Sequence, residues 1–336
     1  MDGKKARIAT VIAIVILMLL FVLAALFFLS NSKPQSSEGN ASPSLAVESE
    51  SDEEIFAPED LNDISESGDV SLEKEDIEVE PSSLSFTNAR EDYPHLTDEQ
   101  FANFRMISTA GIGEGTLFRT SSPVNPANNR NTYADAALRK AGVTTILNLA
   151  DTQQAVEAFP GYADSYYATT NYICLAMGFS VYEDEFKAKL ADGLRFLAKH
   201  EGPYALHCME GKDRTGMVAG FLECFMGASL EEVERDYMLT FYNYYGVKPG
   251  MKIYEDIVSS NLHQALQGAF GVQDLENENL SQLAETFFRS IGLADDEIDA
   301  LRVNLGKSYA APAWLPAAQE GSTASSTASS GINVKR

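Results

Sequence analysis

Cysteine, tryptophan and basic residues are scarce in this chain of 336 residues, which has three Cys, one Trp, and 25 Lys and Arg against 49 Asp and Glu. Three cysteines are too few for the disulfide framework of a small secreted domain, and their odd number leaves at least one thiol free. A formal net charge of −24 disfavours nucleic-acid binding, which depends on basic side chains that neutralise phosphates. The sequence also contains no internal repeat of fixed period.

Residues 8–29 lack any charged side chain. At about 1.5 Å of helical rise per residue this stretch spans the ~30 Å hydrocarbon layer, which predicts that residues 1–30 form an anchor in the lipid bilayer. Lys4, Lys5 and Arg7 precede the stretch, so the positive-inside bias predicts a single-pass protein of the cell membrane with a cytoplasmic N-terminus and an extracytoplasmic remainder. The alternative is a cleaved secretory signal and a secreted protein, but residues 26–31 offer no small-x-small cleavage site.

Spaced apolar positions are almost absent between residues 31 and 80, where 16 acidic residues stand against two lysines and contribute 14 of the 24 net negative charges. Such a composition buries too little apolar surface to offset chain entropy, which predicts a disordered, acidic, Ser-rich stalk over residues 31–89. The low-complexity end predicts a disordered tail over residues 307–336. One folded domain, residues 90–306, remains.

Short β-rich runs and amphipathic stretches alternate in the first half of this domain. Residues 143–149, 172–177 and 204–208 read as strands, and residues 184–200 have apolar side chains at helical spacing. A helix ending at Gly142 extends the alternation, which predicts an α/β fold with a central, mostly parallel sheet flanked by helices. The second half reads as helical. Its expected helices are residues 215–226, 230–244 with a Ser229 capping box, and segments near 250–268, 278–290 and 294–305.

Cys208 and Arg214 are separated by five residues, between the strand that ends at Cys208 and the helix that Thr215 opens. A loop in this position can turn its main-chain N–H groups from Met209 onward towards one anion, reinforced by the positive end of the helix. The same field favours the thiolate form of Cys208, the form that attacks phosphorus. Arg214 offers a planar, two-pronged donor to phosphate oxygens.

Three further loop residues have expected supporting parts. Gly211 permits a sharp backbone course, while His207 and the Thr215 hydroxyl help to hold the negative charge of the sulfur. Taken singly, each of these residues has an ordinary structural explanation, such as a core thiol or a helix cap. Their combination at this spacing, between a strand and a helix, predicts a phosphate-handling site.

The loop resembles that of the Cys-x5-Arg phosphatases, and its ending Gly-Lys-Asp-Arg-Thr-Gly (residues 211–216) resembles the bacterial tyrosine-protein phosphatases of broad specificity. Residues 103–105 and 117–121 are similar to the entry motif of that family, and residues 236–240 and 288–302 to its helical second half. The resemblance implies the cysteine-phosphatase fold and a supporting part for Arg119. Met106 and Ala150 depart from the family pattern, where an aspartate and an arginine are usual.

The resemblance implies that Asp213 is the general acid that protonates the leaving group. Asp184, after the second expected strand, is the alternative general acid, because other branches of the superfamily carry theirs there; Asp151 is a third candidate. Lys212 adds positive potential towards the substrate, whereas Glu210 repels polyanions.

Taken together, the sequence predicts a protein tyrosine phosphatase that hydrolyses phosphate monoesters through a phosphocysteine intermediate, with no metal and no cofactor. Dual or triple specificity is compatible with the resemblance. The alternatives are a phosphoinositide or inositol phosphate phosphatase and, from another class, a phosphate-binding pseudophosphatase. The catalytic residues expected are Cys208, Arg214 and Asp213, and the substrate-binding residues are Met209, Glu210, Gly211, Lys212 and Thr215.

Overall fold

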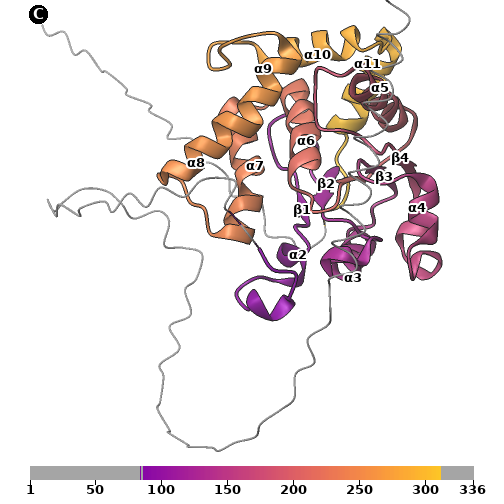
Figure 1. Cartoon of the computed structure of the whole chain (residues 1–336). Coiled ribbons are helices and arrows are strands. Elements are labelled where there is room, and N and C mark those ends of the chain that lie inside the picture. Colours follow the sequence, from indigo (N-terminus) through magenta and orange to yellow (C-terminus); the bar gives the residue numbers. More distant parts are fainter. Residues whose placement is uncertain (1–83, 85, 312–336) are drawn as a thin grey trace, which may run out of the picture. The chain divides into compact units, whose positions relative to one another are not determined.

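A computed structural model describes residue 84 and residues 86–311 (Figure 1). The predicted membrane anchor, most of the predicted stalk and most of the predicted tail lie outside the described residues. Within residues 84 and 86–311, no helix has the length and apolar character needed to cross a bilayer.

Five short strands form one sheet in the order β1-β2-β5-β3-β4. Only the β1–β2 pair is antiparallel; β2–β5, β5–β3 and β3–β4 are parallel, so the predicted mostly parallel sheet is confirmed. The strands are β1 (Arg105–Met106), β2 (Leu117–Thr120), β3 (Thr145–Asn148), β4 (Asn171–Cys174) and β5 (Tyr204–His207).

The register aligns the carboxyl ends of the parallel strands. His207 of β5 lies opposite Thr120 of β2 and Asn148 of β3, and Asn148 lies opposite Cys174 of β4. The segments that follow these strands therefore leave the sheet at the same edge, where ligand sites of parallel sheets are usually built.

The predicted helical second half is confirmed. The helices are α2 (Asp98–Phe101), α3 (Asn131–Ala141), α4 (Gln153–Ala158), α5 (Asp184–Lys199), α6 (Asp213–Met226), α7 (Leu230–Tyr245), α8 (Lys252–Ile257), the π-helical segment η7 (Val258–His263), α9 (Gln264–Phe270), α10 (Leu280–Ser290) and α11 (Asp295–Gly306). Helix α6 runs through the middle of the folded part, in contact with α7, α9 and α10 (Figure 1).

Helix boundaries follow the chemistry of the residues at their ends. Gly142 ends α3 in the left-handed conformation, and Ser229 caps α7 with Glu232 in the predicted capping box. The stretch expected as one helix near 250–268 is divided into α8, η7 and α9. Strands β1 and β2 were not predicted: β1 has only two residues, and in β2 the apolar Leu117 and Phe118 are followed by Arg119 and Thr120, which gives neither an apolar run nor an alternation.

Each face of the sheet covers its own core, as the pleat of the strands requires. On β3, Leu147 packs with residues of α5, α6, α10 and α11, whereas its neighbour Ile146 packs on the opposite side with Leu138 of α3 and Val156 of α4. The carboxyl edge of the sheet therefore lies between two packed layers of helices, one on each face of the sheet.

The residues before α2 are tied to the domain by the fully buried Arg130. Its guanidinium group lies 3.9 Å from the ring centre of Phe101 and 4.4 Å from that of Tyr244, and it donates hydrogen bonds to main-chain carbonyls of Phe101 and Thr87. Phe86 stacks on Tyr244, so packing extends to the N-terminal side of residue 90.

Packing also continues beyond residue 306. The main-chain N–H of Tyr309 donates to the carbonyl oxygen of Glu114, and Thr116 donates to the carbonyl oxygen of Lys307. Both ends of the folded domain therefore extend past the boundaries read from composition, because single aromatic or main-chain contacts leave no compositional signal.

Candidate active site

The segment His207 to Arg214 joins the end of β5 to the first turn of α6 at the carboxyl edge of the sheet. Gly211 has a φ of +70°, and a Cβ atom at this position would lie 2.4 Å from the carbonyl oxygen of Thr120. Only glycine fits here, because both the backbone conformation and the close approach of β2 exclude a side chain. The loop is thereby folded tightly against the segment after β2.

The carbonyl oxygens of the loop are held from outside. Asn103 Nδ2 donates to the carbonyl oxygens of Glu210 (3.1 Å) and Gly211 (3.0 Å), and Arg119 Nη2 donates to those of Gly211 (2.9 Å) and Lys212 (3.2 Å). The carbonyl oxygen of Met209 accepts from the main-chain N–H of residue 122, at 3.1 Å.

The corresponding N–H groups remain free. Within the described part of the chain, the main-chain N–H groups of residues 209–212 donate to no protein group. Four unpaired donors at the beginning of a helix of 14 residues form a site suited to an anion with several oxygen atoms, such as phosphate.

A buried charge network positions Asn103 and Arg119, the two residues whose side chains donate to the loop carbonyls. Asp236 of α7 accepts from Arg105 Nε at 2.8 Å and from Arg119 Nη1 at 2.6 Å. Arg105 Nη1 also donates to Asn103 Oδ1 at 2.7 Å, which fixes the orientation of that amide. Although burial opposes ionisation of Asp236, the two guanidinium groups hold its pKa below the ordinary value.

Glu223, fully buried on α6, adjoins this network without forming an ion pair within the described residues. Burial, with a contribution from Asp236, raises its pKa well above the ordinary value. The raised pKa favours the protonated form of Glu223, so Asp236 is the carboxylate that pairs with the two arginines of the network.

Cys208 is buried, with 4 % of its surface exposed, at the base of the loop. His207 before it is fully buried, and burial lowers its pKa to about 3, so its ring is neutral at physiological pH. The expectation that His207 helps to hold the negative charge of the sulfur stays a prediction, and a neutral ring would do so without a charge of its own; its Nδ1 lies 3.4 Å from the carbonyl oxygen of Cys208. The buried hydroxyl of Thr215 has no hydrogen-bond partner in the described residues.

Arg214 lies at the opposite end of the loop, in contact with the segments after β3 and β4. Its Nη1 donates to the carbonyl oxygen of Met177 at 3.2 Å and of Leu149 at 3.4 Å, and its guanidinium carbon lies 4.8 Å from the ring centre of Phe179. Its Nε is buried without a partner in the described residues, so this donor is available to a ligand.

The outer part of the loop carries alternating charges. Lys212 Nζ lies 3.2 Å from Glu210 Oε2 and 3.8 Å from Asp213 Oδ2. The contact with Glu210 is an ion pair that lacks the geometry of a hydrogen bond. Burial raises the pKa of Asp213, which Lys212 opposes and Glu210 reinforces. Asp213 therefore keeps its proton to a higher pH than an ordinary aspartate, as a proton donor requires.

The other two acid candidates lie elsewhere. Asp184 is the exposed first residue of α5 and forms no hydrogen bond or ion pair with the loop in the described residues. Asp151 accepts from Asn148 at the end of β3. Aromatic side chains of α7 also contact the loop: the ring centres of Phe241 and Tyr245 lie 5.7 and 5.6 Å from Lys212 Nζ, and the Tyr244 hydroxyl donates to the carbonyl oxygen of Glu210 at 3.4 Å.

The structure thus brings Cys208, Asp213 and Arg214 into one loop and places Arg119 directly behind it. Sequence reasoning assigned no part to Asn103, Arg105, Asp236 or Glu223. The signal for Glu223 was available, because it is a single acidic residue in the apolar run 217–226.

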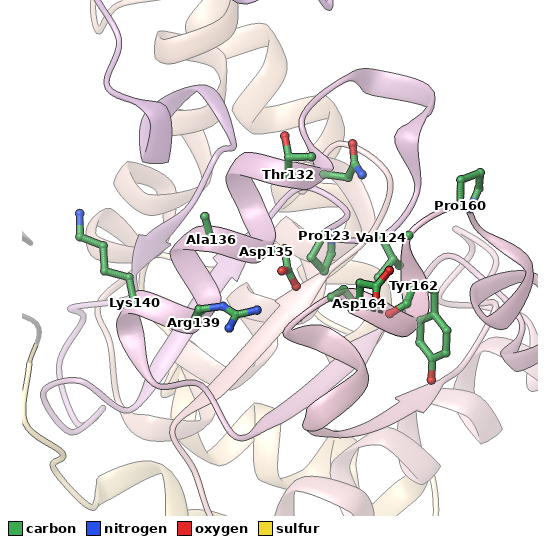
Figure 2. Close-up of a pocket in the computed structure, with 13 residues that line it drawn as sticks. Pro123, Val124, Thr132, Asp135, Ala136, Arg139, Lys140, Pro160, Tyr162 and Asp164 are labelled. Atoms are coloured by element: carbon green, nitrogen blue, oxygen red, sulfur yellow. Dashed lines mark hydrogen bonds between the residues drawn. The ribbon is translucent and has the colours of Figure 1, made fainter.

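A cavity of about 440 Å³ lies between α3 and residues 160–165 (Figure 2). Pro123 and Val124, which line it, follow Ser122, whose main-chain N–H donates to the carbonyl oxygen of Met209. Its Asp135 accepts from the main-chain N–H groups of Tyr166 and Tyr167, which gives that carboxylate a structural part.

The chain belongs to the Tyrosine phosphatase family, whose profile matches residues 99–307. A tyrosine-protein phosphatase from Nostoc commune is 27 % identical over 128 residues, which cover 34 % of this chain and 42 % of the relative. The chain thus spans about two fifths of that curated relative's length.

Solved structures with similarity to this chain include two phosphatases. TpbA of P. aeruginosa is 20 % identical, with a TM-score of 0.26, and the match covers 61 % of this chain and 92 % of TpbA. The core catalytic domain of the PP-IP phosphatase SIW14 from S. cerevisiae is 16 % identical, with a TM-score of 0.30, and covers 47 % and 85 %.

Replacing Asn103 by aspartate tests whether its hydrogen bonds to the carbonyl oxygens of Glu210 and Gly211 are needed for phosphate binding. Asn103→Asp keeps the size of the side chain and the tolerance for φ of +54°, but sets a carboxylate against two carbonyl oxygens. We expect the Kd for inorganic phosphate to rise about tenfold to a hundredfold, since each unpaired buried group costs ~1–3 kcal/mol. Asn129→Asp, at a similar φ of +53° on the surface, is the matched control; equal effects at both positions would contradict the explanation.

The part of Asp213 is tested by the pH dependence of turnover. With phenyl phosphate, whose leaving group needs a proton, kcat should fall as pH rises through the raised pKa of Asp213, because the acid form is lost. Asp213→Asn should remove this limb and lower kcat by about a hundredfold. Asp184→Asn should leave both kcat and its decrease at high pH unchanged. The reverse pattern would identify Asp184 as the general acid.

Proposed function

We propose that this protein hydrolyses phosphate monoesters through a phosphocysteine intermediate and that phosphotyrosine in proteins is its principal substrate. The observation that carries the proposal is the set of free N–H groups of residues 209–212, positioned between Cys208 and Arg214. Membership of the tyrosine phosphatase family supports it.

In the first step, the Cys208 thiolate forms a bond to phosphorus while the bond from phosphorus to the ester oxygen breaks. The leaving oxygen takes the proton of Asp213. The N–H groups of the loop and the Arg214 guanidinium stabilise the charge on the remaining phosphate oxygens. In the second step, the Asp213 carboxylate takes a proton from water, whose oxygen attacks phosphorus and releases inorganic phosphate and the thiolate.

The charge around the loop favours substrates with one phosphate. Lys212, the cation closest to the outer rim of the loop, lies between two acidic side chains, Glu210 and Asp213. A second phosphate group would meet the Glu210 carboxylate rather than a free cation. A phosphoinositide or inositol phosphate substrate is therefore the second candidate. The joint presence of Cys208, Asp213, Arg214 and Thr215 argues against a phosphate-binding pseudophosphatase.

The uncharged stretch 8–29 and the basic residues before it support a placement of the phosphatase domain outside the cell membrane on an N-terminal anchor. Protease treatment of intact cells should then remove the domain while a cytoplasmic marker protein stays intact. A domain that survives until the cells are lysed would overturn this topology.

The activity is tested with a phosphotyrosyl peptide, the parent protein and Cys208→Ser. We expect turnover that a metal chelator does not change and that the substitution abolishes, because serine is a far weaker nucleophile than a thiolate. Turnover of phosphoinositides but not of the peptide would select the second candidate. Binding of phosphate without turnover of either substrate would select the pseudophosphatase.

A further inference from the structure

A groove of about 580 Å³ lies between the segment after β4 and the helix formed by η7 and α9. One wall contains Phe179 and Tyr182, whose exposed fractions of 62 % and 71 % are large for aromatic side chains. The other wall consists of hydroxyl, amide and small residues. These are Ser260, Asn261, Gln264, Ala265, Gln267, Gly268, Gly271, Val272 and Gln273.

The groove adjoins the phosphate loop. The ring of Phe179 covers the Arg214 guanidinium, 4.8 Å from its central carbon, and the carbonyl oxygen of Met177, two residues earlier, accepts from Arg214. On the other wall, Asn261 interacts with Tyr237, against whose ring the backbone of Gly216 is packed. A substrate with its phosphate at the loop therefore has this groove beside it.

Backbone geometry holds the two walls together. A Cβ atom on Gly268 would lie 2.6 Å from the Tyr182 hydroxyl oxygen and 3.0 Å from Val181, so the aromatic wall rests directly on α9. The opposite wall begins with the π-helical turn of η7, which widens the helix at Ser260 and Asn261. Such turns are rare and are frequently found at functional sites.

The lining selects the chemistry of the occupant. It contains no Lys, Arg, Asp or Glu, so it offers no counter-charge to a second phosphate group. An acyl chain would bury the amide groups of Asn261 and Gln264 without partners, which is unfavourable. Amides and hydroxyls provide both donors and acceptors, as the peptide groups of an extended chain require, and the exposed aromatic rings offer surface to its side chains.

We propose that this groove binds the polypeptide on one side of the phosphorylated residue, so that the enzyme prefers phosphorylated proteins to small phosphate esters. The proposal rests on the proposed function. It assigns Tyr182 and Gln264 to substrate selection and gives them no part in the chemical step.

The test introduces a charged side chain into the groove and measures whether the enzyme then prefers a peptide of the opposite charge. Two phosphotyrosyl peptides are used, one with lysines and one with glutamates on both sides of the phosphorylated residue, together with free phosphotyrosine. For Gln264→Glu, the ratio of kcat/KM for the basic peptide to that for the acidic peptide should rise about fivefold, and for Gln264→Lys it should fall by a similar factor. The kcat/KM for free phosphotyrosine should change by less than about twofold, since that substrate does not reach the groove.

Gln282→Glu and Gln282→Lys, at an exposed position of α10, control for the charge of the whole protein. Tyr182→Ala should lower the preference for either peptide over free phosphotyrosine about fivefold, whereas Tyr242→Ala, at an exposed tyrosine of α7, should not. Equal shifts at positions 264 and 282, or no shift at 264, would overturn the groove proposal while hydrolysis of phosphotyrosine by the parent protein stands. A parent protein that hydrolyses only inositol phosphates would overturn both proposals.

Discussion

The site depends on hydrogen bonds from side chains outside the loop 207–214 to the main-chain carbonyl oxygens of that loop. A main chain that turns its N–H groups towards one point must turn its carbonyl oxygens away, and these need donors in a buried setting. Asn103 and Arg119 supply those donors, and Asp236 keeps Arg119 in place from a different helix. The anion site is therefore a consequence of packing between the first two strands, β5 and α7.

The charges of the site are arranged in two layers with different tasks. Beneath the loop, two buried arginines share one carboxylate, Asp236, and the pKa of the neighbouring Glu223 is raised. At the rim, Lys212 lies between Glu210 and the protonatable Asp213. In the proposed function, the inner layer favours an anion at the loop, and the outer layer disfavours further negative charge on the substrate and provides the proton donor.

The fold could be read from the sequence where a pattern is local and long enough. The helix after Asp184, the end of α3 at Gly142 and the capping box at Ser229 follow from spacing and end residues alone. Strands β1 and β2 and the π-helical turn were not predicted. The two strands show neither an apolar run nor an alternation, and the π-helical turn lies within the stretch near 250–268 that reads as one helix.

The sequence by itself determined the chemistry at the loop: a cysteine, an aspartate and an arginine fixed at short spacing between a strand and a helix. These residues lie together wherever the chain folds, since they are neighbours along it. Only the tertiary structure decided what surrounds them, including the neutral state of His207, the network of Arg105 and Asp236, and the groove beside Phe179. The network joins Arg105 to Asp236 and the groove joins Phe179 to Asn261, pairs that are more than 80 positions apart in the chain. Burial, which lowers the pKa of His207, exists only after the layers have packed.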